Sequence, residues 1–242
     1  MGDQFEWLCG DSLTVLRSQP TASFDAVVTD PPYCSGGAHI ADRQRPAGEK
    51  YQQDGGKFYA EFAGEARDQR SWAFWCVLWL SECLRVTKPG GRLLCFIDWR
   101  QLPMLTDVVQ AAGWTWRSIA AWDKGLGSRA GHKGYHRHQC EYVVIASHGK
   151  LPKDVHDGPY PGCFHVPVKH REKFHMTGKP VELMRKLLAC VPPGGRVLDP
   201  FGGSASTGVA AIELGLHFTG VEATEHYHSI GAQRLLEAKQ RA

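Results

Sequence analysis

The segment TDPPYC at residues 29–34 places an acid, two prolines and an aromatic ring directly after a short apolar run, FDAVV at residues 24–28. The run is typical of a buried strand, and two consecutive prolines cannot donate hydrogen bonds to a sheet, so the chain must leave the sheet there. Asp30 and Tyr33 are therefore fixed at a strand's end. A rigid segment of this kind suits the positioning of a flat polar group. The simpler alternative is an ordinary strand end followed by a surface turn.

A second informative segment, RVLDPFGGSASTGVAAIELG, spans residues 196–215. A buried strand reaches Asp199, and a glycine-rich turn then allows close approach of the backbone to a ligand. A second strand ends at Glu222, about twenty residues past the glycines, where an acid is placed to bind ribose hydroxyls. The segment predicts an adenosine-binding βαβ unit, against the alternative of a glycine cap and a surface glutamate. Three hydroxyl side chains are expected to cap its helix: Ser204, Ser206 and Thr207.

The turn discriminates between adenosine cofactors. GGSASTG matches the dinucleotide spacing GxGxxG only imperfectly, and the phosphate-binding sequence GxxxxGK[ST] is absent. An acid at Asp199 would also repel a pyrophosphate. An acidic pocket favours a cationic cofactor without phosphate, and S-adenosylmethionine carries both a sulfonium and an ammonium group.

The elements that position these segments alternate between strand-like and helix-like runs. This alternation predicts an α/β fold with a mostly parallel sheet and helices on both faces, in a single domain over residues 1–242. The run at 72–86 is apolar nearly all round and predicts a buried helix, and 180–191 has helical spacing. Seven strands are expected, at residues 5–8, 26–29, 92–97, 118–122, 142–146, 196–198 and 218–221.

Two stretches have the same pattern, LRVTKPGGRLLCFID at 84–98 and LLACVPPGGRVLDPF at 187–201. Each predicts a helix, a Pro-Gly-Gly turn and a buried strand. A favoured connection between a helix and a strand explains the similarity better than a duplication does.

Composition sets limits on the class of protein. The hydrophobic content is 43%, the net charge is +3, and eight cysteines are scattered without a CxxC pair. The cysteine pattern favours a reducing compartment and argues against disulfides or structural zinc. The histidine-rich stretch at 132–140 matches no standard ligand spacing, so no metal is expected. We expect a cytoplasmic protein, because no secretory signal and no membrane-spanning apolar stretch is present.

The two motifs together resemble those of the DNA amino-methyltransferases, which methylate adenine N6 or cytosine N4. DPPY at 30–33 is similar to their catalytic motif, and DPFGGSASTG at 199–208 is similar to their cofactor motif, although Ala205 stands where the family has its last glycine. The order, with the catalytic motif first, resembles the β-class arrangement. The resemblance implies a Rossmann-like methyltransferase fold in circularly permuted form, with S-adenosylmethionine as the cofactor.

The resemblance also implies roles for residues. Asp30 and the Pro31 carbonyl would accept the hydrogens of the target amine, Pro32 would fix the turn, and Tyr33 would stack on a base extruded from the duplex. The methyl group would transfer directly, without a covalent enzyme intermediate. The residues implied to bind the cofactor are Asp11 in CGDSL, Asp30, Lys179 in HMTGKP, Asp199, Pro200, Phe201, Gly202, Gly203, Ser204, Ser206, Thr207 and Glu222.

Double-stranded DNA is the implied partner. Two irregular stretches at 34–70 and 125–174 are candidate recognition insertions. DPPY favours adenine, and cytosine N4 is the alternative; RNA or a protein amide as substrate, a non-catalytic DNA-binding protein and a dehydrogenase fit less well. Relatives of this class suggest a homodimer, no membrane partner is expected, and the sequence does not disclose a restriction partner. The basic residues predicted to contact phosphates or bases, rather than only water, are Arg43, Arg45, Lys50, Arg129, Lys133, Arg137, Lys169 and Arg171.

Overall fold

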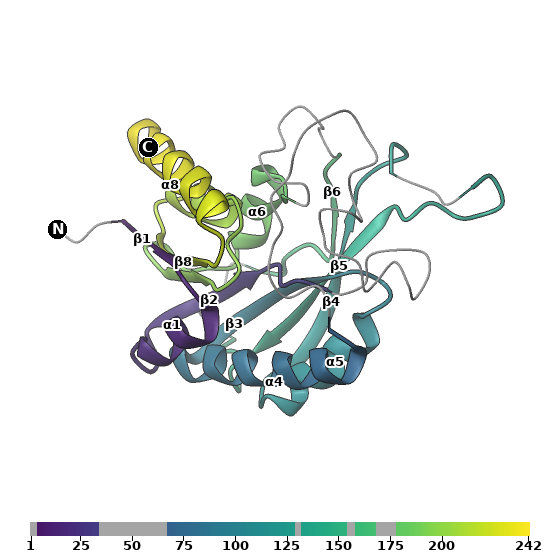
Figure 1. Ribbon diagram of the computed structural model, residues 1–242, viewed down its shortest axis with the longest axis horizontal. Helices are drawn as coiled ribbons and strands as arrows, with labels where there is room; N and C mark the ends of the chain where they lie inside the picture. The colour runs from purple at the N-terminus through teal and green to yellow at the C-terminus, as the bar shows by residue number, and fades with distance from the viewer. Residues whose placement is uncertain (1–3, 34–66, 129–131, 154–157, 168–177) are drawn as a thin grey trace.

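The computed structural model describes residues 4–33, 67–128, 132–153, 158–167 and 178–242 (Figure 1). Most of the 34–70 stretch and parts of the 125–174 stretch lie outside the described residues. Six of the basic residues predicted to contact DNA also lie outside them: Arg43, Arg45, Lys50, Arg129, Lys169 and Arg171.

The described strands form one eight-stranded sheet in the order β1-β8-β7-β2-β3-β5-β4-β6. Only β5 runs antiparallel to its neighbours β3 and β4, and every other described pair is parallel. The predicted mostly parallel α/β sheet is therefore confirmed. The strands are β1 (Phe5–Cys9), β2 (Phe24–Thr29), β3 (Thr87–Ile97), β4 (Thr115–Asp123), β5 (Cys140–Ser147), β6 (Cys163–His165), β7 (Arg196–Asp199) and β8 (His217–Glu222).

The strand count differs from the prediction. All seven expected strands are present, and β6 is an eighth that pairs with the end of β4. Its three residues lie in a stretch rich in glycine, proline and histidine, where neither length nor alternation indicates a strand.

Helices cover both faces of the sheet, as predicted (Figure 1). Side chains alternate along the central strands, so Val27 and Leu93 pack with the helices of one face, whereas Val28 and Leu94 pack with those of the other. One face carries α1 (Ser12–Ser18), α4 (Gln69–Val86) and α5 (Leu102–Ala111), and the other carries α6 (Val181–Leu188), α7 (Ser206–Glu213) and α8 (Glu225–Arg241).

Helix α4 begins where Asp68 accepts hydrogen bonds from the backbone N–H groups of Arg70 and Ser71. Trp72 and Trp79 are buried on the side that faces the sheet. The predicted buried helix is present, but it is buried on that side only, because 68% of Phe74 is exposed on its outer side.

The two Pro-Gly-Gly segments differ in structure. Residues 192–195 form the expected turn, closed by a hydrogen bond from the Gly195 N–H to the Pro192 carbonyl. The segment at 89–91 does not form such a turn and lies within β3. It is an irregularity in the pairing with β2, because Phe24 lies opposite Thr87 whereas Ala26 lies opposite Arg92.

The two ends of the chain meet in the sheet. β1 pairs with β8 from Phe5 opposite Phe218 to Cys9 opposite Glu222, and β2 lies between β7 and β3 at the centre. The N-terminal strand therefore completes the half of the sheet that carries the glycine-rich turn. Within the described part of the chain, no helix is both long and apolar enough to cross a membrane.

Candidate active site

The predicted site residues converge at one edge of the sheet. Asp30 follows the end of β2, Asp199 ends the adjacent parallel strand β7, and Glu222 ends β8. The carboxyl ends of parallel strands are where ligands bind in open α/β sheets. Glu141 joins this edge from the opposite direction, because β5 is antiparallel and begins there.

A cluster of charged side chains surrounds Asp30. One carboxylate oxygen forms an ion pair with Lys179, and the other accepts a hydrogen bond from the Tyr33 hydroxyl. The Lys179 Nζ atom also lies 3.4 Å from the Glu141 Oε2 atom, and the Lys124 Nζ atom lies 3.1 Å from the Glu141 Oε1 atom. Two carboxylates and two ammonium groups therefore form one connected network.

Burial and charge set the protonation of this cluster. Burial raises the pKa of Asp30, although Lys179 opposes the shift, and burial with the neighbouring Asp30 charge raises the pKa of Tyr33 well above its usual value. Burial alone would lower the pKa of Lys179, but Asp30 and Glu141 together outweigh it and raise that pKa. The lysine therefore stays charged, and the tyrosine stays a hydrogen-bond donor.

The turn after β2 is fixed by its neighbours. The Trp72 indole N–H, on the first turn of α4, donates to the Pro32 carbonyl at 2.8 Å. Pro31 is buried, and no donor among the described residues reaches its carbonyl oxygen. The stiffness predicted for DPPY thus has two sources, the proline rings and the anchor from α4.

Asp199 ties the two central strands to the glycine-rich turn. Its carboxylate accepts hydrogen bonds from the Thr29 hydroxyl at 2.8 Å, the Thr207 hydroxyl at 2.6 Å and the Phe201 N–H at 3.1 Å. Burial raises its pKa to about 6. These internal donors give Asp199 a structural role. Its direct contact with a cofactor stays a prediction.

The hydroxyls of the turn do not cap α7, contrary to expectation. The residue before the helix is Ala205, which has φ of +60° and forms no side-chain cap. Thr207 bonds to Asp199, and the Arg234 guanidinium of α8 donates to the hydroxyls of Ser204 at 3.0 Å and Ser206 at 3.3 Å. The left-handed conformation explains why glycine suits the position of Ala205.

Glu222 lies beside the turn. Its carboxylate accepts hydrogen bonds from the N–H groups of Gly203 at 3.0 Å and Thr224 at 2.8 Å. A Cβ atom on Gly202 would lie 2.5 Å from the Trp7 ring, whereas one on Gly203 would meet no atom within 4 Å. The turn is thus packed on one side and open on the other.

Asp11, another residue predicted to bind the cofactor, caps α1. Its carboxylate accepts a hydrogen bond from the Thr14 N–H at 2.9 Å.

An aromatic group adjoins the turn on the other face of the sheet. The Phe201 ring lies 5.4 Å from the Trp75 ring and 5.1 Å from the Trp79 ring, centroid to centroid. The Arg67 guanidinium lies 5.0 Å above the Trp75 ring. Pro200, next to Phe201, accepts a hydrogen bond at its carbonyl from the Ser12 hydroxyl of α1.

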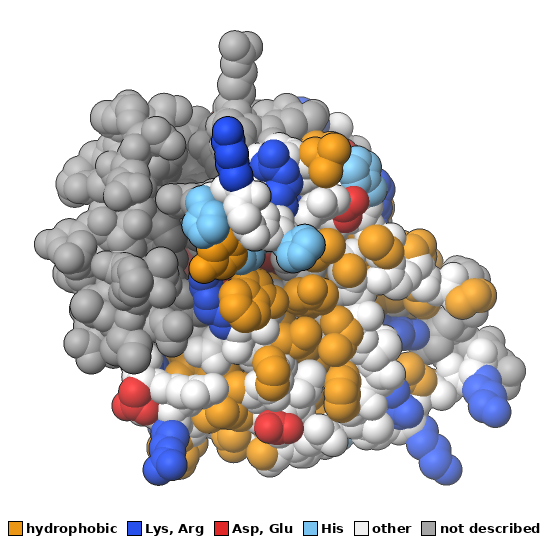
Figure 2. All heavy atoms as spheres, turned by 90° about the vertical axis from the view of Figure 1, so that its right-hand side faces the viewer, with side chains coloured by type: hydrophobic (Ala, Val, Ile, Leu, Met, Phe, Trp, Pro, Cys, Tyr) orange, Lys and Arg blue, Asp and Glu red, His pale blue; other side chains and the backbone are white. Residues whose placement is uncertain are grey.

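Of the residues predicted to contact DNA, the structure describes Lys133 and Arg137. Both are exposed in the segment between β4 and β5, and the Arg137 guanidinium donates to the Ser128 carbonyl at 2.9 Å. Figure 2 shows a face of the molecule on which basic and histidine side chains surround a group of hydrophobic ones, with few acidic side chains.

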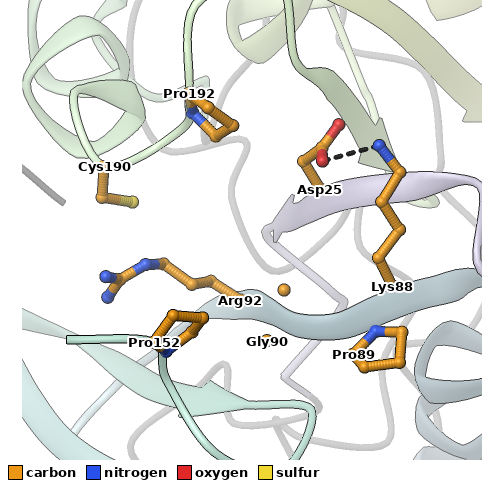
Figure 3. A pocket seen from close by; sticks show the side chains of 9 residues that line it. Asp25, Lys88, Pro89, Gly90, Arg92, Pro152, Cys190 and Pro192 are labelled. Carbon is orange, nitrogen blue, oxygen red and sulfur yellow. Dashed lines mark hydrogen bonds and ion pairs between the residues drawn. The ribbon is translucent and has the colours of Figure 1, made fainter. Parts of the chain in front are cut away.

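A separate pocket of about 160 Å³ lies at the opposite edge of the sheet (Figure 3). Asp25, at the start of β2, bonds there to Lys88 at 2.7 Å. None of the predicted site residues lines this pocket, so it is not a candidate for the chemistry at Asp30.

Glu141, Trp72 and Arg234 also belong to the site, although the sequence alone did not indicate them. A signal existed for Glu141: in a sheet with one reversed strand, an acid at the start of that strand reaches the same edge as an acid at the end of a parallel one. Trp72 and Arg234 have no local signature, because their contacts join segments far apart in the sequence.

This geometry agrees with a family match. A model of N6/N4 enzymes, described as DNA methylase, matches residues 24–233. The chain belongs to this family. YubD of Escherichia coli (strain K12), which is named as a methylase, is 32% identical over 238 residues and is matched over 96% of this chain and 90% of its own length.

Solved structures of other DNA methylases share the fold of this N6/N4 family member. A DNA modification methylase from Thermus thermophilus, complexed with S-adenosyl-L-methionine, has a TM-score of 0.70 at 20% identity and covers 97% of this chain and 94% of its own. The PvuII DNA methyltransferase, which is cytosine-N4-specific, has a TM-score of 0.71 at 16% identity, with 98% and 94% covered.

Proposed function

We propose that this protein transfers a methyl group from S-adenosylmethionine to the N6 amino group of adenine in double-stranded DNA. The observation that carries the proposal is the DPPY turn, which holds the Asp30 carboxylate and the Pro31 carbonyl at the carboxyl edge of the central strands. Family membership supports an amino group of a DNA base as the target, and the aspartate at position 30 favours adenine.

The residues at the edge suit the proposed cofactor. Its sulfonium and ammonium groups are cations, and Asp30 provides an acid at the same edge of the sheet. Glu222 provides an acid for the ribose hydroxyls, beside a glycine turn with an open side at Gly203. Lys179 provides a cation for the carboxylate of the cofactor, and the half-buried Phe201 ring provides an aromatic face. When bound, the cofactor supplies a methyl group on a positively charged sulfur.

The reaction requires the chain to orient the target nitrogen, to stabilise the positive charge that develops on it and to accept a proton. An exocyclic amine is a poor nucleophile because its lone pair is conjugated with the ring. Asp30 and the Pro31 carbonyl would each accept one hydrogen from it, which orients the nitrogen and stabilises the positive charge that develops there. The methylated nitrogen would then give up a proton, and Asp30, whose pKa is raised by burial, would accept it.

The target amine is inaccessible inside a stacked duplex, so the base must be extruded. Tyr33 would stack on the extruded base, and such contacts are worth about 1–3 kcal/mol per base. Basic side chains near the edge, including Lys133 and Arg137, would contact the phosphate backbone of the DNA without specifying its sequence.

We also propose a homodimer, as relatives of this class suggest. Light scattering would measure the mass in solution and so test it.

One experiment tests the proposal. The protein is incubated with methyl-labelled S-adenosylmethionine and duplex DNA from an unmethylated host, and the DNA is digested to nucleosides. Label in N6-methyladenine supports the proposal, label in N4-methylcytosine shifts the target to cytosine, and no label in DNA rejects both.

A matched pair of variants completes the test. Asp30→Ala should abolish transfer, because it removes the carboxylate that is proposed to accept the amine hydrogen. Asp25→Asn, at the opposite end of the same strand, should retain it. Near-normal DNA methylation by Asp30→Ala would exclude this mechanism.

A further inference from the structure

The backbone between Asp30 and Tyr33 is restricted by its two prolines. The rings of Pro31 and Pro32 fix the φ angles of both residues. Asp30 and Pro31 each precede a proline, which confines both to extended conformations. The first torsion that no proline restricts is ψ of Pro32, which sets the direction of the Pro32 carbonyl and the plane of the peptide that leads into Tyr33. The orientation of Tyr33 therefore depends on what holds the Pro32 carbonyl.

A tryptophan side chain holds this carbonyl. The Trp72 indole N–H donates to the Pro32 carbonyl at 2.8 Å, and no other donor among the described residues reaches it. Trp72 is fully buried, so water has no access from that side to replace the indole. Removing the indole N–H would leave the carbonyl without this partner and would free the ψ angle of Pro32.

The start of α4 fixes the tryptophan in turn. The Asp68 carboxylate accepts hydrogen bonds from the N–H groups of Arg70 at 2.9 Å and Ser71 at 3.0 Å, which caps the helix. The Trp72 backbone N–H donates to the Asp68 carbonyl at 2.9 Å. The indole therefore projects from a capped helical turn, which makes it a rigid anchor for a segment 40 residues earlier in the chain.

The Tyr33 ring has one face turned toward a charge. The Lys179 ammonium lies over this ring, 5.6 Å from its centroid, so an extruded base would stack on the other face. The Tyr33 hydroxyl donates to the Asp30 carboxylate and holds the tip of the ring. A rotation of the peptide before Tyr33 would tilt the ring about that tip. Both ends of the side chain must therefore be held for the free face to keep its direction.

We propose that Trp72 is a positioning residue that orients the Tyr33 ring for the extruded base. This inference rests on the proposed function. The buried indole touches neither the base nor the cofactor. It acts by fixing the Pro32 carbonyl, and so the peptide plane from which Tyr33 projects. The two prolines make the turn rigid as far as Pro32, and the indole extends that rigidity to the ring.

The first test compares DNA and cofactor binding in Trp72→Phe, which keeps a buried aromatic ring and removes the N–H donor. The KM for duplex DNA should rise about three- to tenfold, the range expected when one net hydrogen bond is lost. The affinity for S-adenosylhomocysteine, measured by calorimetry, should stay within about twofold of the wild type. A KM that matches the wild type overturns the proposal, as does an equal loss of cofactor affinity, which indicates general loosening.

Trp114→Phe is the matched control. Trp114 is also buried, and its indole N–H donates to the Leu80 carbonyl of α4 at 3.0 Å. It lies just before β4, which begins at the edge of the sheet opposite Asp30. Trp114→Phe thus removes the same kind of hydrogen bond away from the turn, and it should keep the wild-type KM for DNA. An equal rise in both variants overturns the proposal.

A double variant tests whether Trp72 acts through Tyr33. Tyr33→Ala removes the ring that the indole is proposed to orient. Adding Trp72→Phe to Tyr33→Ala should therefore leave the KM for DNA unchanged, because the two substitutions remove the same contact with the base. A further rise of about threefold or more in the double variant would mean that Trp72 acts by another route, and the proposal would fail.

Fluorine NMR of protein labelled with fluorotyrosine needs no activity. Loss of a signal in Tyr33→Phe assigns Tyr33. This signal should be single and sharp in the wild type and in Trp114→Phe, and it should split or broaden in Trp72→Phe, where the ring samples more than one orientation. A single sharp Tyr33 signal in Trp72→Phe overturns the proposal. A wild-type protein that transfers no methyl group to DNA refutes the proposed function, and the NMR comparison then still decides whether Trp72 orients Tyr33.

Discussion

Asp30 and Lys179 lie 149 residues apart in the sequence, and their side chains form an ion pair at the edge of the sheet. The pair joins the turn after β2, which carries the proposed catalytic acid, to the segment before α6, which leads into the glycine-rich turn. The proposed catalytic and cofactor segments are thus connected by an ion pair.

Tyr33 should matter to the base more than to the cofactor. Tyr33→Ala removes the stacking surface, so the KM for DNA should rise by about 5- to 150-fold, the range that corresponds to 1–3 kcal/mol. Tyr33→Phe keeps the ring and loses only the hydrogen bond to Asp30, so it should retain most of the DNA affinity. Calorimetry with S-adenosylhomocysteine should give wild-type affinity for both variants. A large loss of that affinity would contradict the assignment.

Phe201 should matter to the cofactor. Its half-buried ring lies against Trp75 and Trp79 at the mouth of the glycine-rich turn. Phe201→Ala should weaken S-adenosylhomocysteine binding about tenfold, because an aromatic contact of roughly 1 kcal/mol or more is lost. Phe74→Ala removes an exposed ring of α4 and is the matched control. Equal affinities in the two variants would contradict the prediction.

Asp199 should give the fold a specific pH dependence. Its pKa is raised by burial from 3.8 to about 6, so between about pH 4 and pH 6 the folded protein holds a proton that the unfolded chain has released. The free energy of unfolding contributed by this group therefore falls as the pH rises through that window, by up to about 3 kcal/mol.

Urea denaturation from pH 4 to pH 7 measures this effect as a difference between variants. Asp199→Asn should remove the fall, so the gap between variant and wild type should change with pH across the window. Asp107→Asn, on the exposed side of α5, should leave the wild-type dependence intact. Parallel curves for Asp199→Asn and the wild type would refute the raised pKa.

Gly220 should be intolerant of a side chain. A Cβ atom there would lie 2.5 Å from the rings of both Trp7 and Phe218, and overpacking of this kind costs about 1–3 kcal/mol. Gly220→Ala should lower the Tm by about 2–10 °C, measured by circular dichroism. A Cβ atom on Gly127 would meet no atom within 4 Å. Gly127→Ala should therefore keep the Tm within about 1 °C of the wild type, since exposed substitutions are near neutral. A stable Gly220→Ala protein would show that Trp7 can move aside.

Much of the framework was predictable, because strands buried on both faces give continuous apolar runs and glycine-rich turns have local signatures. All seven expected strands are present, and the three acids expected at strand ends, Asp30, Asp199 and Glu222, lie at one edge of the sheet. The family resemblance drawn from DPPY and the glycine-rich turn was also confirmed.

The parts that could not be predicted depend on tertiary contacts. Strand β6 is too short to have a pattern. The Pro-Gly-Gly sequence at 89–91 predicts a turn, but pairing with β2 on both sides of the segment makes it part of β3. The expected helix cap at Ser204 is absent because Ala205 is the residue that precedes the helix, and the Ser204 hydroxyl accepts a hydrogen bond from Arg234, thirty residues along. Sequence spacing alone cannot reveal such a contact.

The pairing of β1 with β8 has a consequence for synthesis on the ribosome. The β1 segment is translated long before the β8 segment with which it pairs. The Trp7 ring, which packs against Gly202, Gly220 and Gly231, has no partner surface until those positions are translated. The half of the sheet that carries the glycine-rich turn should therefore assemble only after β8 has left the ribosome.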